Sequence, residues 1–94
     1  MNKDEIRKAR KQLKQLAKQL AAIGPVMRGS VVRIGTRNKQ FYFSLNKDKK
    51  TRVIYLGNDR EPLAHKLSEN YKKLTAIVEE MTLLNMELLK NDEL

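Results

Sequence analysis

The chain has no cysteine and no tryptophan, a single histidine, and few aromatic residues, which make up 5% of its 94 positions. Without cysteine there is no disulfide framework, no thiolate metal site and no cysteine nucleophile. The absence also fits a reducing compartment, and we expect a cytoplasmic protein. No apolar run reaches the roughly 18 residues that a membrane span requires. The N-terminal residues MNKDEIRKARKQ lack the apolar core of a secretory signal.

Signatures of catalysis are also missing. His65 has no cysteine, aspartate or second histidine at ligand spacing, so we interpret it as a surface residue of a helix. Glu79 and Glu80 are adjacent, point about 100° apart on a helix, and cannot act as a carboxylate pair. The four glycines form neither a GxGxxG nor a P-loop pattern. We therefore expect no enzymatic activity, no cofactor and no bound metal.

Positive charge is what the chain has in excess, with a net charge of +9. Residues 1–23 carry seven lysines and arginines against two acids, and residues 24–57 carry eight against one. Residues 58–94 reverse the balance, with five against eight. A basic region of this kind favours a polyanionic partner, most simply nucleic acid.

Residues 3–23 predict a helix, with Asn2 as its cap, Glu5 completing a capping box, and Gly24 before Pro25 as a stop. Its apolar residues alternate in steps of three and four, which is the heptad spacing of a coiled-coil seam. They are Ile6, Ala9, Leu13, Leu16, Leu20 and Ile23. The other face is uniformly basic and is either a solvated surface or a contact for phosphates or an acidic partner. The narrow apolar face has no Trp or Phe, so we expect no membrane attachment.

Residues 26–57 change to the alternating pattern of strands and predict a three-stranded antiparallel meander. Turn-prone residues separate the strands at 35–39 and 46–50. In the middle strand Phe41, Phe43 and Leu45 share one face, which we expect to be core. Tyr42 and Ser44 share the other face, which we expect to point outward beside basic residues of the neighbouring strands.

The orientation of the third strand stays open. Val53 and Tyr55 lie on one of its faces. Arg52, Ile54 and Leu56 lie on the other, and either set can point inward. The hairpin tip before this strand, NKDKK, carries three lysines.

The densest basic stretch coincides with this meander, and a two-stranded ribbon fits the major groove of B-DNA. We expect Arg33 and Arg52 to contact bases, because strands hold them rigidly, and the loop lysines to contact phosphates. RNA is the nearest alternative, since exposed aromatic rings on a sheet stack unpaired bases. DNA is favoured because so few tyrosines are available. The predicted nucleic-acid-binding residues are Arg28, Arg33, Arg37, Lys39, Tyr42, Ser44, Lys47, Lys49, Lys50 and Arg52.

Residues 59–90 predict a long second helix, capped by Asn58 or Asp59, with Pro62 in its first turn. Its expected seam alternates in steps of four and three. The seam residues are Leu67, Tyr71, Leu74, Val78, Met81, Asn85 and Leu88. Further apolar residues lie off this line, so the last turns are apolar over more of their circumference than one partner helix covers. The residues off the line are Ile77, Leu83, Leu84, Met86 and Leu89.

A second subunit is the partner that we expect for this apolar end, and the chain is therefore predicted to form a homodimer. The predicted dimerisation residues are Leu74, Ile77, Val78, Met81, Leu84, Asn85 and Leu88. Asn85 either sets the register of a buried helical interface or is exposed near a frayed end. The two helices either pack within one chain or exchange between subunits, and periodicity does not decide between these arrangements.

These patterns predict one α+β domain over residues 1–94, with a helix at 3–23, a β-meander at 26–57 and a helix at 59–90. The two helices are expected to pack as a coiled-coil-like pair. The long meander between them excludes a helix-turn-helix. The predicted function is binding of nucleic acid, with DNA favoured. The alternative is a protein-interaction or adaptor module whose apolar C-terminal helix binds a protein partner.

Three stretches together resemble an uncharacterised family of small bacterial and mobile-element-associated proteins. They are GPVMRGSVV at 24–32, QFYFSLNKDKKTRVIYL at 40–56 and ENYKKLTAIVEEMTLLN at 69–85. The family pattern is a G-P-x-x-x-G-S-L start, a Cys-rich loop, a YYxLS…GKT…VY hairpin and a long NYRRL helix. This chain has GTRNK in place of the Cys-rich loop, so the family's metal expectation does not apply. The resemblance implies this layout, and its association with mobile elements favours DNA.

Overall fold

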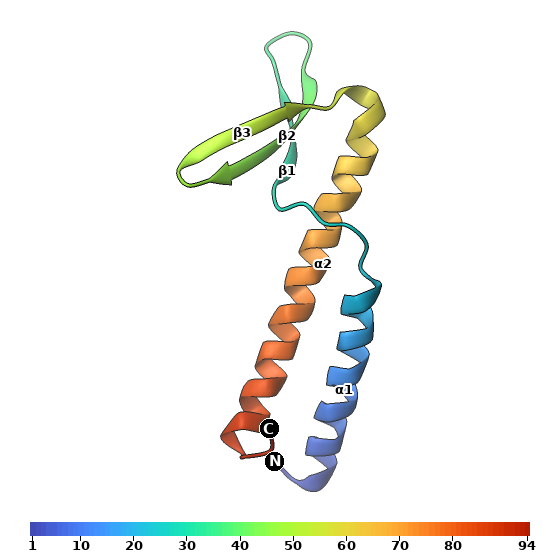
Figure 1. Ribbon diagram of the computed structural model, residues 1–94, viewed down its shortest axis with the longest axis vertical. Helices are drawn as coiled ribbons and strands as arrows, with labels where there is room; N and C mark the ends of the chain where they lie inside the picture. Colours follow the sequence, from blue (N-terminus) through green and yellow to red (C-terminus); the bar gives the residue numbers. More distant parts are fainter. The chain divides into compact units, whose positions relative to one another are not determined.

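The structure is a computed structural model that describes residues 1–94, and it has an α+β fold, as the sequence predicts (Figure 1). Two helices flank a three-stranded antiparallel sheet in the order α1, β1, β2, β3, α2. The helices are α1, Lys3–Ala22, and α2, Gly57–Lys90. The strands are β1, Ser30–Ile34, β2, Gln40–Lys47, and β3, Lys50–Tyr55.

The chain forms two compact units, which are described separately below. The helical unit comprises Met1–Ile23 and Lys73–Leu94, and the sheet unit comprises Gly24–Lys72. Helix α2 belongs to both, because its residues 57–72 lie in the sheet unit and its residues 73–90 lie in the helical unit.

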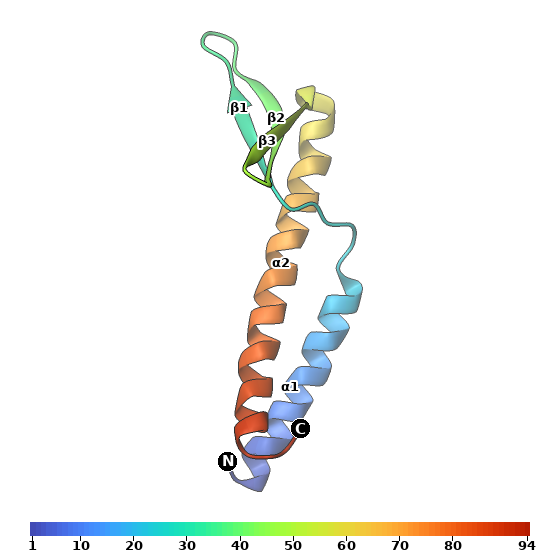
Figure 2. The same ribbon diagram turned by 60° about the vertical axis from the view of Figure 1, so that its left-hand side comes forward.

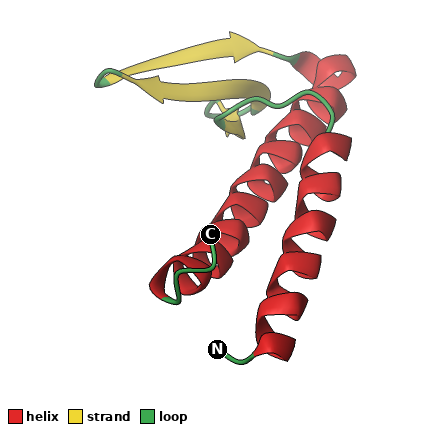
Figure 3. Cartoon of the chain, turned by 60° about the horizontal axis from the view of Figure 1, so that its bottom comes forward, coloured by secondary structure: helices red, strands yellow, loops and turns green.

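In the helical unit, α1 runs antiparallel to the C-terminal part of α2 within one chain (Figures 1 and 3). The predicted cap is confirmed, since the Asn2 side chain accepts a hydrogen bond from the Glu5 backbone nitrogen at 2.8 Å. The predicted seam of α1 is also confirmed. The seam residues are buried or half-buried, whereas all the remaining residues of this helix are exposed. The two helices therefore pack as a coiled-coil-like pair, with Ala9 and Leu16 as the most buried residues of α1.

The buried line on α2 differs from the predicted one. Leu74, Met81 and Leu88 are less exposed, as expected, but between Leu74 and Met81 the buried residue is one position earlier than predicted. Between Met81 and Leu88, the predicted Asn85 and its neighbour Leu84 are both half-buried. Ile77 is 9% exposed, whereas Val78, which was predicted for the seam, is 48% exposed. A heptad period results whether the apolar residues alternate in steps of four then three or of three then four. Because apolar residues occupy both alternatives here, periodicity alone could not choose between them.

In the sheet unit, β2 lies between β1 and β3 (Figure 2). Val31 pairs with Phe43, and Phe43 pairs with Ile54 on the other side. Directly paired residues of antiparallel strands lie on the same face of the sheet. This register settles the third strand: Ile54 lies on the face of Phe43, and Tyr55, which pairs with Tyr42, lies on the opposite face.

The core of the sheet unit forms on the Phe43 face, as the sequence predicts. Phe43, Leu56 and Ala64 are buried together, so this face packs against the beginning of α2. Met27, Val31, Phe41 and Leu45 are partly buried around this cluster. We call this side of the sheet the inner face.

The segment between α1 and β1 is held to α2 by hydrogen bonds from a side chain and between backbone atoms. The Asn70 amide donates to the Pro25 carbonyl at 3.0 Å, and the Met27 nitrogen donates to the Leu67 carbonyl at 3.2 Å. Asn70 is only 9% exposed. A buried amide with its hydrogen bond satisfied fixes where the chain enters the sheet.

Gly29 precedes β1 at a point where no side chain fits. Its φ is +141°, and a Cβ atom there would lie 2.5 Å from the Ser44 carbonyl oxygen and 2.7 Å from the Phe43 ring. Its carbonyl accepts a hydrogen bond of 2.8 Å from the hydroxyl of Ser68, which is buried. This close approach of backbone to core requires glycine.

Helix α2 begins earlier than predicted, directly after β3, at Gly57 with φ +67°. Asn58 and Asp59 therefore lie inside the first turn, and the expectation that either caps the helix is wrong. Pro62 lies inside the helix, beyond the first turn. The left-handed conformation of Gly57 allows the chain to turn from strand to helix without a loop, and this is the signal that cap-based reasoning missed.

Candidate nucleic-acid interface

The side of the sheet opposite the core, which we call the outer face, carries no charged residue. The alternation of the strands and their register place ten uncharged residues on it. They are Ser30, Val32, Ile34, Gln40, Tyr42, Ser44, Asn46, Thr51, Val53 and Tyr55. The face therefore offers aromatic rings, aliphatic side chains, hydroxyls and amides, but no group that attracts a phosphate by its charge.

Two tyrosines lie side by side on the outer face. Tyr42 and Tyr55 are cross-strand partners whose ring centroids are 5.5 Å apart at an interplanar angle of 69°, an edge-to-face pair. Tyr55 is 49% exposed and its hydroxyl donates to Gln40 Oε1 at 3.4 Å. Edge-to-face packing holds both rings in defined positions. The outer face thus presents a partly exposed, ordered aromatic pair.

The backbone beneath Tyr55 is fixed by an arginine of α2. The Arg60 guanidinium donates to the Tyr55 carbonyl at 2.5 Å and to the Leu56 carbonyl at 3.2 Å. A hypothetical Cβ on Gly57 would lie 3.4 Å from the Tyr55 hydroxyl, so the ring lies against this glycine. These contacts orient Tyr55, and they explain why Arg60, which the sequence analysis passed over, has a structural role.

The arginines expected to contact bases lie on the inner side of the sheet. Arg33 pairs with Phe41, and Arg52 pairs with Leu45, so both share the face of the core residues. The Arg33 guanidinium carbon lies 5.4 Å from the centroid of the Phe41 ring, a cation–π contact. Lys47 and Lys50 pair with each other on this same face.

The expectation that Tyr42 and Ser44 have basic neighbours is therefore wrong. Tyr42 is flanked by Val32 and Tyr55, and Ser44 pairs with Val53 on one side. The basic residues within the strands pair with Phe41, Leu45 or one another, at positions of the same face as Phe43. They are Arg33, Lys47, Lys50 and Arg52. The strand register, which the sequence did not reveal, puts them on the opposite face.

Six of the eight predicted cations gather at the two ends of the sheet instead. The turn between β1 and β2 carries the turn cluster, which comprises Arg37 and Lys39. The end of the sheet at the turn between β2 and β3 carries the hairpin cluster, which comprises Arg28, Lys47, Lys49 and Lys50. Arg28 joins this end because its guanidinium donates to the Asn46 carbonyl at 3.0 Å.

All eight predicted cations are exposed, including Arg33 and Arg52 within the strands. The two turns lie at opposite ends of β2 (Figure 2). A strand rises about 3.3 Å per residue, so the clusters are on the order of 23 Å apart along it. The predicted binding residues thus form a central uncharged face with a basic group at each end.

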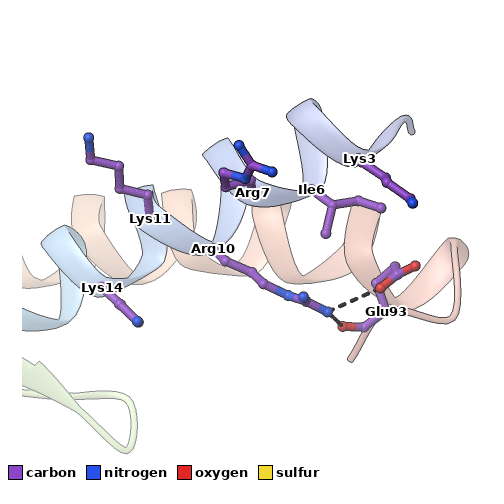
Figure 4. A pocket seen from close by; sticks show the side chains of 7 residues that line it. All are labelled: Lys3, Ile6, Arg7, Arg10, Lys11, Lys14 and Glu93. Carbon is purple, nitrogen blue, oxygen red and sulfur yellow. Dashed lines mark hydrogen bonds and ion pairs between the residues drawn. The ribbon is translucent and has the colours of Figure 1, made fainter.

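A second basic surface lies on α1 in the helical unit. A hollow of about 540 Å³ opens between α1 and the C-terminal residues (Figure 4). Its lining residues are Lys3, Ile6, Arg7, Arg10, Lys11, Lys14 and Glu93. The Arg10 guanidinium reaches across it to the Glu93 carboxylate at 3.1 Å and to the Glu93 carbonyl at 2.9 Å. Lys11 extends away from this ion pair (Figure 4).

The residues predicted for dimerisation do not form one exposed surface. Ile77 and Leu88 are 9% and 1% exposed and are covered within the helical unit. Leu74, Met81, Leu84 and Asn85 are half-buried, and Val78 is exposed. Exposed large apolar residues of α2 that the dimerisation prediction did not include are Leu63, Leu83, Met86 and Leu89.

Beside the buried line, α2 carries a further uncharged line of residues, which we call the second stripe. It consists of Thr75, Val78, Thr82, Asn85 and Leu89, at alternating steps of three and four. Val78 and Leu89 are 48% and 63% exposed. Helix α1 covers the buried line of α2, and the second stripe is the surface that another helix could cover.

Neither a protein-family model nor a curated protein nor a solved structure gives a significant match to this chain. No three His, Cys, Asp or Glu side chains come together where they could hold a metal ion. None of the helices combines the length and the apolar character needed to pass through a membrane.

Proposed function

We propose that the protein binds nucleic acid through its sheet unit. The observation that carries the proposal is the Tyr42–Tyr55 pair, partly exposed on an uncharged face with a basic cluster at each end. Aromatic rings stack on bases, whereas lysines and arginines bind phosphates and supply most of the affinity. DNA is the favoured nucleic acid, and a cytoplasmic location is part of the proposal.

A salt titration tests this function. We expect fluorescence anisotropy with a labelled DNA to report binding that weakens steeply with salt, because each neutralised phosphate releases a counterion. If about five phosphates are contacted, the slope of log K against log salt is about −3.5 for a single strand and about −4.5 for a duplex.

Charge removal at the two clusters identifies the surface. A variant with Arg37→Ala and Lys49→Ala should bind several-fold more weakly and show a salt slope closer to zero by about 1–2 units. The matched control is Lys73→Ala with Lys90→Ala, which removes the same charge from exposed positions of α2 outside the sheet unit. An equal loss in both variants would mean that the sheet is not the binding surface.

A homodimer through the second stripe is the further part of the proposal, and the exposure of Val78 and Leu89 favours it. In a two-fold symmetric contact the same surface meets itself. A stripe without charge can do so without like-charge repulsion, which matters in a chain of net charge +9. The stripe from Thr75 to Leu89 is about 21 Å long at the rise of an α-helix.

Sedimentation equilibrium tests the dimer. We expect the wild-type chain to sediment as a dimer at micromolar concentration, and Val78→Glu with Leu89→Glu to sediment as a monomer. Ala17→Glu with Ala21→Glu places the same charges on exposed positions of α1 and should leave the dimer intact. A monomeric wild-type protein would overturn this part and favour the alternative, an adaptor that presents the stripe to another protein.

A further inference from the structure

We propose that the outer face of the sheet holds an unpaired DNA strand, with bases stacked on Tyr42 and Tyr55 and the flanking phosphates held by the turn cluster and the hairpin cluster. This inference rests on the proposed function and names the form of nucleic acid that the site takes. The juxtaposition that carries it is an ordered aromatic pair on an uncharged face with cations only at its ends.

The distribution of charge disfavours a duplex as the occupant. A ribbon that reads the major groove presents arginines and lysines to the base edges from the face that enters the groove. Here the strand arginines, Arg33 and Arg52, share the inner face with Phe41 and Leu45. The face that could enter a groove has none. An unpaired strand instead exposes its bases, whose rings need an aromatic platform and no charge.

The geometry of the outer face suits stacking. The tyrosine rings are held edge-to-face 5.5 Å apart, and the Arg60 contacts with the Tyr55 and Leu56 carbonyls fix the strand beneath. Ser44 lies beside Tyr42 on the same face and offers a hydroxyl to a base edge. The phosphates on either side of the stacked bases would extend along β2 toward its basic ends.

The neighbours of the tyrosines favour DNA over RNA. Tyr42 pairs with Val32, and Val53 lies next to Tyr55 along the outer face. A ribose 2′-hydroxyl pressed against these valines would lose water without gaining a hydrogen bond, which is unfavourable. Deoxyribose has only a methylene at this position.

Binding to three labelled oligonucleotides of about 25 residues tests the inference. They are a single-stranded DNA, an RNA of the same sequence, and the DNA duplex. We expect the single-stranded DNA to bind tightest. Tyr42→Ala and Tyr55→Ala should each weaken its binding about 5- to 150-fold, the effect of losing one stacked base, whereas Tyr42→Phe and Tyr55→Phe should retain it.

Intrinsic fluorescence gives a second readout that does not require truncating a tyrosine. The chain has three tyrosines and no tryptophan. In a Tyr71→Phe background all tyrosine emission comes from Tyr42 and Tyr55, and we expect single-stranded DNA to quench it at saturation. Unchanged emission, or retained affinity in the alanine variants, would overturn the stacking site.

The outcomes separate this inference from the function on which it rests. Tighter binding to the duplex overturns the inference but leaves nucleic-acid binding through the sheet in place. Tighter binding to RNA overturns the choice of DNA. Absence of binding to all three oligonucleotides overturns both the inference and the proposed function.

Discussion

Replacement of Gly29 by alanine should destabilise the sheet unit more than any exposed substitution, for two separable reasons. The φ of +141° lies in a region that is essentially restricted to glycine, and a residue with a Cβ held there costs about 1–3 kcal/mol. The Cβ would also lie 2.5 Å from the Ser44 carbonyl oxygen and within 2.9 Å of two atoms of the Phe43 ring. Such overpacking costs about 1–3 kcal/mol in addition.

The two costs together amount to about 2–6 kcal/mol. A domain of this size has a total stability of roughly 5–15 kcal/mol, so the loss is a large fraction of the whole. Relief would require either the Phe43 ring or the β2 backbone to move. Phe43 is in the buried cluster of the sheet unit, and its movement would open the core.

Urea unfolding followed by circular dichroism measures this loss, with Gly24→Ala as the matched control. A Cβ on Gly24 meets nothing closer than the Asn70 amide nitrogen at 3.6 Å, an ordinary contact. This variant should therefore change the free energy of unfolding by less than about 1 kcal/mol. If the two alanine variants unfold at the same urea concentration, Gly29 is not in the conformation described here.

Two further predictions concern neighbouring positions with opposite surroundings. Leu88→Ala should lower the free energy of unfolding by about 2–5 kcal/mol because Leu88 is 1% exposed. Leu89→Ala, at 63% exposure, should change it in the isolated chain by less than about 0.5 kcal/mol. Thermal unfolding of both variants, at a protein concentration below that of any self-association, measures the difference. Lys49 has a φ of +63°, which glycine adopts without strain, so Lys49→Gly should stabilise the hairpin by about 1 kcal/mol in urea unfolding. The substitution also removes one cation from the hairpin cluster. A destabilised variant would contradict the left-handed conformation of Lys49.

The sequence predicted the elements and the seam of α1 because these depend on local pattern. The six apolar residues of that seam recur without a competing line, since the rest of α1 is polar, basic or alanine. On α2 two apolar lines compete, and only the packed partner shows that Ile77 rather than Val78 is buried. Periodicity gives the period of a seam, and tertiary packing chooses among lines of equal period.

The candidate site was predicted less completely, because its composition depends on cross-strand register. The sequence singled out the cations and Tyr42, but it could not tell that Arg33 and Arg52 fall on the inner face. Nor could it tell that Tyr55 joins Tyr42. A one-residue shift of a strand exchanges its two faces, and no local signal fixed β3 against β2.

The division of the chain into units has a consequence for the order in which it folds during synthesis. The sheet unit is one continuous segment, Gly24–Lys72, and its contacts are complete once that segment has left the ribosome. The helical unit joins α1 to residues after Lys72, as in the ion pair between Arg10 and Glu93. Helix α1 is made first but must wait for its partner, and contacts between residues so distant in sequence form slowly. During that interval, no partner helix covers the apolar seam of α1, whose most buried residues in the folded chain are Ala9 and Leu16.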